Sequence, residues 1–303
     1  MKHLDFAASY GIALLVGTVV TLSSCSEEVM NPENEPVYAS VNVKVNEFSV
    51  SMEDFPSTRA AESPADYTAV GAITLAFYDA NGVEVEKTTQ YRSELSDVTT
   101  FGQFSFTLPI GNYTLVALAY KYLDGDVLEL TSPTSAVYTS ATPRETFCTT
   151  RSVTITSGAA LDLSLTLYRV STWLAVKSTD KCPVAATKVR TTYTAAGKGF
   201  NPTTGLATGD AGFSVLNSVV DSIGRTININ SSAFLTSNEQ VMDITLQVLD
   251  DDDHVLITKE VENVPLMRNR ITLLKGRLFT SSTASAASFT LETEPISKIT
   301  VMF

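Results

Sequence analysis

The stretch Val41-Asn42-Val43-Lys44-Val45 alternates apolar and polar side chains, and the alternation resumes in the opposite phase at Phe48, Val50 and Met52. Because successive side chains of a β-strand point to opposite faces, this stretch predicts a strand with one buried face. The change of phase near Glu47 predicts a β-bulge or a break in the strand.

The same two-residue alternation recurs along the rest of the chain, with almost no sustained helical period. Asn81-Gly82, between apolar runs, is typical of a β-hairpin turn. Short strands separated by regular turns predict an all-β fold of the sandwich type. Strands are expected within residues 71–80, 83–87, 101–108, 113–119, 127–130, 153–156, 161–170, 185–193, 213–220, 227–229, 241–249, 255–261 and 271–279, loops at residues 132–143 and 197–205, and a flexible connection at residues 281–288.

The chain is long enough for two domains after an N-terminal signal. The sequence has 303 residues, and domains of 100 to 150 residues are common. Residues 161–177 form one run without glycine or proline, so the boundary is placed near Arg169 to Thr172. The predicted domains are residues 37–170 and 171–303.

The N-terminus has the order of a secretory signal, with a short apolar run ending at Leu22-Ser23-Ser24-Cys25. This pattern resembles a bacterial lipobox, which implies removal of residues 1–24 and a lipid anchor on Cys25. An unlipidated signal peptide is the alternative, and the apolar run is too short for a permanent transmembrane helix. Residues 25–36 are polar and acidic and predict a solvated tether. They also resemble the export signal of surface lipoproteins in Bacteroidetes.

Residues 56–64 are small and polar between two prolines, the composition of an exposed loop that proteases cut. Arg59, followed by Ala60, is the one basic residue of this loop. At the other end of the sequence, Ile299, Val301 and Phe303 alternate on one face, so this last strand is expected to be buried by pairing.

Charge and cysteine content limit the possible partners. The net charge of −12 argues against nucleic acid and anionic lipid surfaces as partners. Cys148 and Cys182 can form a disulfide in an oxidising compartment, or they can be two buried free thiols.

Catalytic and metal-binding patterns are sparse, and neither an enzyme nor a cofactor is predicted. His254 is the one histidine after the signal, so a two-histidine metal site cannot be built. The four carboxylates of residues 250–253 could bind calcium, but their spacing favours a solvated hairpin tip. Tyr168 and Trp173 could form a sugar-binding platform, although their apolar neighbours favour the core.

Several short motifs together resemble the fimbrillins of Bacteroidetes, the subunits of type V pili. They are the lipobox, Thr58-Arg59-Ala60, Ile73-Thr74-Leu75-Ala76-Phe77-Tyr78-Asp79 with its Asn-Gly turn, Leu108-Pro109-Ile110-Gly111-Asn112-Tyr113, Leu167-Tyr168-Arg169-Val170, and residues 263–272 with Gly276. The resemblance implies two transthyretin-like, Greek-key β-sandwich domains, lipoprotein export, cleavage after Arg59 and polymerisation by strand exchange.

Two functions follow from these expectations. The first is a structural or adhesive fimbrial subunit on the outer membrane, whose partners are other fimbrial subunits. The second is a surface lipoprotein that binds glycans or host ligands without polymerising.

Asp221-Ser222-Ile223 also resembles the O-glycosylation triplet of Bacteroidetes, although such triplets arise by chance in a chain rich in serine.

Overall fold

The computed structural model describes residues 36–49, 61–123, 127–139, 142–280 and, as backbone, 290–295. These residues contain nineteen strands and three short 3-10 turns, and no α-helix lies among them. The all-β prediction is confirmed. No helix of this described part has the length and apolar character needed to cross a membrane.

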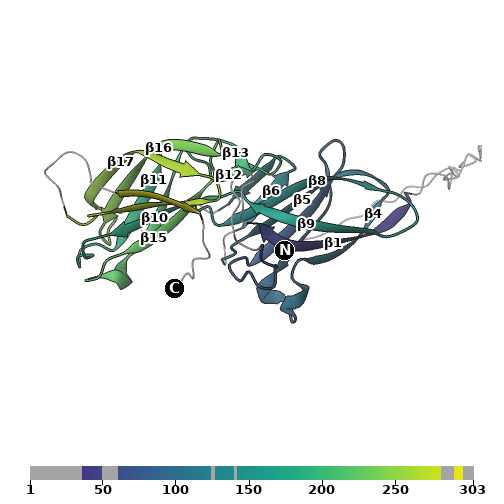
Figure 1. The fold of residues 1–303 in the computed structure, drawn as a ribbon, viewed down its shortest axis with the longest axis horizontal. Coiled ribbons are helices and arrows are strands. Elements are labelled where there is room, and N and C mark those ends of the chain that lie inside the picture. The colour runs from purple at the N-terminus through teal and green to yellow at the C-terminus, as the bar shows by residue number, and fades with distance from the viewer. Residues whose placement is uncertain (1–35, 50–60, 124–126, 140–141, 281–289, 296–303) are drawn as a thin grey trace, which may run out of the picture. The chain divides into compact units, whose positions relative to one another are not determined.

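Seven strands of the N-terminal half form one sheet in the order β3-β2-β5-β8-β9-β1-β4. Figure 1 shows β1 lying beside β9 and β4. The strands are β1 (Tyr38–Ser49), β2 (Ala72–Tyr78), β3 (Glu84–Tyr91), β4 (Gln103–Pro109), β5 (Gly111–Tyr120), β8 (Thr146–Ile155) and β9 (Leu161–Arg169).

This seven-stranded sheet folds into two layers at the junction of β8 and β9. The two strands pair only at Phe147↔Arg169 and Cys148↔Tyr168. Side chains from β2, β5 and β8 on one side, and from β1, β4 and β9 on the other, share one buried hydrophobic cluster. The N-terminal half is therefore a β-sandwich with the layers β3-β2-β5-β8 and β9-β1-β4.

The C-terminal half has two four-stranded sheets, β14-β11-β16-β17 and β15-β10-β18-β19, around a second cluster. Their strands are β10 (Thr172–Ser178), β11 (Lys188–Tyr193), β14 (Phe213–Ser218), β15 (Asn228–Ala233), β16 (Glu239–Leu249), β17 (Val255–Met267), β18 (Arg270–Gly276) and β19 (Thr290–Pro295). The run of residues 161–177 is divided between β9 and β10, and Val170 and Ser171 separate the two strands.

Two segments that were expected to be loops contain strands instead. Residues 132–143 include β7 (Ser135–Tyr138), and residues 197–205 include β12 (Gly199–Asn201). With β6 (Leu128–Ser132) and β13 (Leu206–Ala207) they form a small sheet in the order β13-β12-β7-β6. β6 agrees with the strand expected within residues 127–130, whereas β7 and β12 were missed because each is too short to show a period. Their pairing with each other joins residues far apart in the sequence, as at Phe200↔Ala136.

The small sheet belongs to a third hydrophobic cluster, which contains residues of both halves. Tyr138 stacks on Phe234 with ring centroids 6.2 Å apart, and Phe200 lies 4.6 Å from Phe234. Residues 36–303 accordingly form one compact unit by their contacts.

Local turn chemistry agrees with the sequence at two points. Gly82 has φ of 77° in the hairpin between β2 and β3, a conformation that glycine adopts without strain. The pairing register of β1 with β9 shifts between Val45 and Glu47, which confirms the expected irregularity.

Candidate assembly site

β1 is an interior strand of the sheet, although it precedes all other described strands in the sequence. It pairs antiparallel with β4, from Tyr38↔Pro109 to Lys44↔Gln103. On its other side it pairs parallel with β9, from Val41↔Leu161 to Ser49↔Tyr168. The fold thus inserts the first strand between two strands that come later in the chain.

The inner face of β1 supplies part of the N-terminal core. Val41, Val43, Val45 and Phe48 are all at most 1% exposed. The Phe48 ring lies 5.0 Å from the ring of Phe147 and 5.7 Å from that of Tyr67. The alternation places Val41, Val43 and Val45 on one face of the strand. The bulge between Val45 and Glu47 shifts the alternation by one residue, so Phe48 lies on the same face.

The outer face of β1 is polar and hydrogen-bonds to both neighbouring strands. Asn42 Nδ2 donates to Asp162 Oδ1 at 2.8 Å, and Ser105 Oγ donates to Asn42 Oδ1 at 3.0 Å. Thr166 Oγ1 donates to Glu47 Oε1 at 3.0 Å. Side-chain bonds of this kind help to fix the register of β1 against β4 and β9.

The segment after residues 50–60 is held by the guanidinium of Arg92. Nε donates to Val70 O at 2.9 Å, Nη1 to Ala65 O at 3.1 Å, and Nη2 to Tyr67 O at 3.0 Å and to Pro64 O. The group also lies 4.5 Å from the centroid of the Phe101 ring, and burial lowers the pKa of Arg92. Residues 64–70 therefore have anchors of their own, independent of β1.

A buried polar network lies beside Phe48. Arg169 Nη2 is 2.5 Å from Glu145 Oε1 and 2.8 Å from the Tyr67 hydroxyl, which itself donates to Glu145 Oε1 at 2.7 Å. Arg169 Nη1 donates to Asn269 Oδ1 at 3.1 Å, in the turn between β17 and β18. This network joins the segment after residues 50–60 to both halves of the chain.

Sequence reasoning did not find Arg92, Glu145 or Arg169 as structural centres. A charged residue within or beside an apolar run is a sequence signal for a buried charge. Arg169, which follows Leu167 and Tyr168, shows this signal. Their partners could not be inferred, because Glu145 and Arg169 meet only after β8 and β9 pair.

The residues predicted for lipidation, for cleavage and for the terminal donor strand lie outside the described residues. These are Cys25, Arg59 and Ala60 near the N-terminus, and Ile299, Val301 and Phe303 near the C-terminus. Phe48 N donates to Glu62 O at 2.9 Å, and this hydrogen bond joins the end of β1 to the segment that follows residues 50–60.

Cys148 and Cys182 are both buried free thiols in the structure. Cys148 Sγ donates to Pro202 O at 3.4 Å within the third cluster, whereas Cys182 lies in the second cluster. Burial raises the pKa of both thiols. The structure thus has the second of the two alternatives that the sequence allowed.

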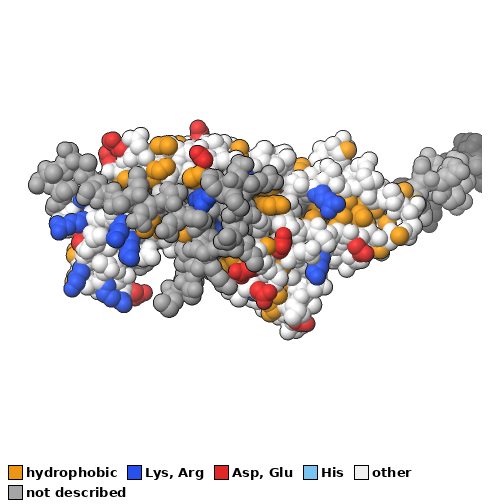
Figure 2. Space-filling view, in the orientation of Figure 1, with side chains coloured by type: hydrophobic (Ala, Val, Ile, Leu, Met, Phe, Trp, Pro, Cys, Tyr) orange, Lys and Arg blue, Asp and Glu red, His pale blue; other side chains and the backbone are white. Residues whose placement is uncertain are grey.

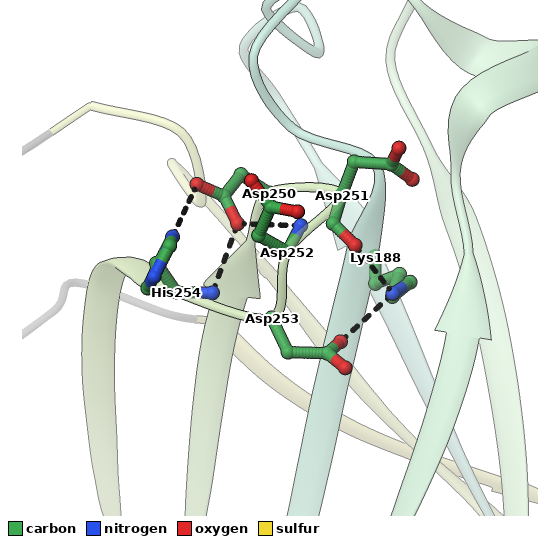
Figure 3. Close-up of polar contacts among 6 residues, drawn as sticks. All are labelled: Lys188, Asp250, Asp251, Asp252, Asp253 and His254. Carbon is green, nitrogen blue, oxygen red and sulfur yellow. Dashed lines mark hydrogen bonds and ion pairs between the residues drawn. The ribbon is translucent and has the colours of Figure 1, made fainter.

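The four aspartates form the tip of the hairpin between β16 and β17, as expected (Figure 3). Asp250 Oδ1 accepts from the backbone N of Asp252 and of His254, and Lys188 Nζ lies 2.8 Å from Asp253 Oδ1. Figure 3 shows that the carboxylates point in different directions. Within the described ranges, no group of three or more His, Cys, Asp or Glu side chains is arranged to hold a metal ion.

Tyr168 and Trp173 do not form a joint aromatic platform. Tyr168 is 47% exposed on β9, so its expected place in the core is wrong. Trp173 lies on β10 and is half-buried. Alternation along β9 places Tyr168 on the outer face with Asp162, Ser164 and Thr166.

The described strands define a two-layered all-β sandwich protein whose first strand is internal to its sheet. Residues 37–296 match the family of unknown function DUF6562, and the chain belongs to that family. No curated protein sequence matches the chain.

Similar solved structures include proteins from Bacteroides thetaiotaomicron and Porphyromonas gingivalis. One from Bacteroides thetaiotaomicron, described as "putative polysaccharide binding proteins (DUF1812)", has a TM-score of 0.51 and 11% identity, covering 86% of this chain and 99% of that chain. The fimbrial anchor protein Mfa2 from Porphyromonas gingivalis has a TM-score of 0.49 and 11% identity, covering 84% of this chain and 95% of that chain. The likeness to the Bacteroides thetaiotaomicron protein shows a shared fold, in agreement with the sandwich that the fimbrillin resemblance implied.

Proposed function

We propose that this protein is a structural or adhesive subunit of a cell-surface fimbria. It is exported as a lipoprotein anchored through Cys25 to the outer membrane and faces the cell exterior. Cleavage between Arg59 and Ala60 then separates the anchor and β1 from the rest of the chain. The fimbrillin resemblance supplies this sequence of events, and catalysis has no part in it.

The interior position of β1 is the observation that carries the proposal. Loss of β1 would leave β4 and β9 without a partner in the middle of a sheet and would uncover the core beside Val41, Val43 and Val45. Unpaired backbone groups and exposed apolar surface are costly. An extended segment of another subunit, such as that containing Ile299, Val301 and Phe303, could restore both.

The positions of the Arg92 and Arg169 contacts support removal of β1 as a separate step. The hydrogen bonds of residues 64–70 to Arg92, and those of Tyr67 to Glu145 and Arg169, involve no residue of β1. The body that starts at Ala60 would therefore lose the strand without losing the segment that follows it.

Arg59→Ala tests this function, with Thr58→Ala as the matched control in the same loop. Cells producing each variant are examined for fimbriae by electron microscopy, and the N-terminus of the extracted protein is sequenced. We expect Arg59→Ala to retain Cys25 at its N-terminus and to lack fimbriae, while Thr58→Ala resembles the wild type. Undiminished fibres containing the Arg59→Ala chain would refute the processing step.

The lipid anchor needs a separate test. Intact mass measurement of unprocessed protein from membranes should find Cys25 as the first residue with a diacylglycerol increment, and Cys25→Ala should be released from the membrane fraction. An unmodified N-terminus beyond Cys25 in protein never exposed to proteases would contradict the anchor.

A glycan-binding surface lipoprotein that does not polymerise is the second candidate. It is supported by the fold shared with the Bacteroides thetaiotaomicron protein and by the exposed Tyr168 ring, since aromatic rings stack on sugars. Retention of the strand before Arg59 on the cell surface, together with glycan binding that Tyr168→Ala abolishes, would favour this candidate.

A further inference from the structure

The two halves of the chain repeat the same strand arrangement, with one difference. In the N-terminal half, β1 pairs antiparallel with β4 and parallel with β9. In the C-terminal half, β10 pairs antiparallel with β15 and parallel with β18. The sheet β3-β2-β5-β8 likewise corresponds to β14-β11-β16-β17. β9 therefore corresponds to β18.

The difference is the strand beyond β18. β19 pairs antiparallel with β18 along its whole length, from Arg270↔Pro295 to Lys275↔Thr290. Over most of its length, the corresponding side of β9 has no strand among the described residues, because β8 pairs with β9 only at Cys148↔Tyr168 and Phe147↔Arg169. β4 and β15 are both end strands of their sheets, so the repeat marks β9 as the position left open.

The backbone groups at this open edge can be identified by alternation. Val170 N donates to Thr146 O at 2.9 Å, so even-numbered residues of β9 direct their peptide groups to the side of β8. The pairing with β8 begins at Tyr168, so the peptide groups of the preceding even-numbered residues, Asp162, Ser164 and Thr166, face the open edge. Odd-numbered residues direct theirs to β1.

The open edge of β9 also lacks the usual protection against strand pairing. Residues 161–168 contain no proline, lysine or arginine, and their one charge, Asp162, is hydrogen-bonded by Asn42. By comparison, β3 carries Glu84, Glu86 and Lys87 on its strand at another sheet edge. Native proteins block exposed edges with charges, prolines or bulges, so an unprotected nine-residue edge strand fits a pairing partner. Figure 2 shows hydrophobic side chains on this face of the molecule, and Tyr168 of β9 is 47% exposed.

We propose that the open edge of β9 is an interaction surface that binds, as an added antiparallel strand, residues 296–303 of a second copy of this chain. The segment follows β19, which already pairs antiparallel with the strand corresponding to β9. Its eight residues match the eight residues from Leu161 to Tyr168. The contact leaves β1 in place, so it needs no cleavage at Arg59 and differs from the exchange under Proposed function in its acceptor strand.

Proline at position 164 tests the acceptor edge. Ser164→Pro removes an N–H group that points to the open edge and breaks no ladder bond to β1, a position where strands tolerate proline. Ser164→Ala is the matched control, because it keeps the N–H group. All variants carry Arg59→Ala, so that failure of the processing step cannot affect the result.

The measurement is self-association of the full mature chain by sedimentation velocity, with melting temperature as a check of the fold. We expect the Ser164→Ala chain to associate like the parent. Self-association of the Ser164→Pro chain should be about tenfold weaker, because one ladder hydrogen bond is lost and its acceptor is left unpaired. Self-association of a chain lacking residues 296–303 should be weaker by about tenfold or more, because all the ladder hydrogen bonds of the added strand are lost. Mixed together, these two chains should form a one-to-one heterodimer, because one supplies the acceptor edge and the other the donor segment.

Association of Ser164→Pro as strong as that of the parent, or absence of the heterodimer, would overturn the proposal. Loss of hydrogen-exchange protection at Ser164 and Thr166 on dilution of the parent chain is also expected, and it does not depend on a variant that folds. Protection that persists in the monomer would mean that the edge is covered by the chain itself, which would equally overturn it.

Discussion

At the scale of single residues, buried charge determines where the molecule is most sensitive. Glu145 and Arg169 are 3% and 4% exposed, and each is the ionic partner of the other. Removing one member of a buried pair leaves the other charge without compensation. This cost is larger than the small contribution of an exposed pair.

Arg169→Met should lower the free energy of unfolding by about 3–5 kcal/mol, because Glu145 is left buried and unpaired. Lys87→Met is the control, since it breaks the exposed pair with Glu84 and should cost below about 1 kcal/mol. Urea unfolding followed by circular dichroism measures both. Equal small effects would show that Glu145 is solvated in the folded protein.

The thiols give a second prediction at this scale. In the folded protein neither Cys148 nor Cys182 should react with a thiol reagent, because both are buried and their raised pKa values keep them protonated. After denaturation without reductant, lipidated chains should show two reactive thiols, and unprocessed precursor should show three. Absence of any reactive thiol in denatured lipidated protein would instead reveal the disulfide.

Buried tyrosines predict the response to alkali. Burial raises the pKa of Tyr78 and Tyr120 to about 12 and that of Tyr67, Tyr138 and Tyr193 further above the ordinary value of 10.0. Below pH 10 both folded and unfolded chains hold these protons, so the stabilisation is complete; above it only the unfolded chain loses them. Stability should therefore fall as pH rises from about 10 through 12, and ultraviolet titration of these rings should coincide with unfolding. Ionisation of all tyrosines near pH 10 without loss of structure would contradict their burial.

At the scale of elements, β1 contributes apolar side chains to the core from one face only. Val43→Ala should cost about 2 kcal/mol, because Val43 is buried between the layers and a cavity would remain. Lys44→Ala, on the exposed face of the same strand, should change stability by less than about 0.5 kcal/mol. Thermal unfolding of the two variants compares the faces directly, and similar losses would contradict the assignment of the faces.

Elements that depend on local pattern could be predicted from the sequence. The alternation in residues 41–45, the irregularity before Glu47 and the Asn81-Gly82 hairpin are all present. They follow from side-chain period and turn chemistry, which act between near neighbours in the chain.

Elements that depend on distant pairing could not be predicted. Parallel pairing of Val41 with Leu161 joins residues far apart in sequence, and nothing in either segment specifies the other. The pairing of Phe200 with Ala136 in the small sheet has the same origin, as does the contact of Glu145 with Arg169. Whether Arg59 is cut and what pairs with Val301 remain predictions.

At the scale of the whole molecule, the third hydrophobic cluster connects the two halves. It contains Tyr120 and Tyr138 from the N-terminal half and Phe200 and Phe234 from the C-terminal half. We therefore propose that residues 37–170 and 171–303, although each has its own core, unfold together. A shared cluster makes unfolding of either half expose surface of the other.

Calorimetry tests this coupling. The wild type should unfold in one transition, and Phe234→Ala should separate it into two, since truncation of a buried phenylalanine costs about 3–5 kcal/mol. Phe77→Ala, within the first core, is the control and should lower the melting temperature of the N-terminal half without removing the contact between halves. Two transitions in the wild type would mean that the halves are independent.

The position of β1 between β4 and β9 also has a mechanical consequence. A strand that is hydrogen-bonded on both sides, to β4 and to β9, and is pulled along its own axis is loaded in shear, so that its ladder bonds resist the force together instead of opening one at a time. Any segment that takes this position in a fibre would meet tension along the fibre in the same way. Such a joint would resist tension through its geometry, even where each bond in it is weak.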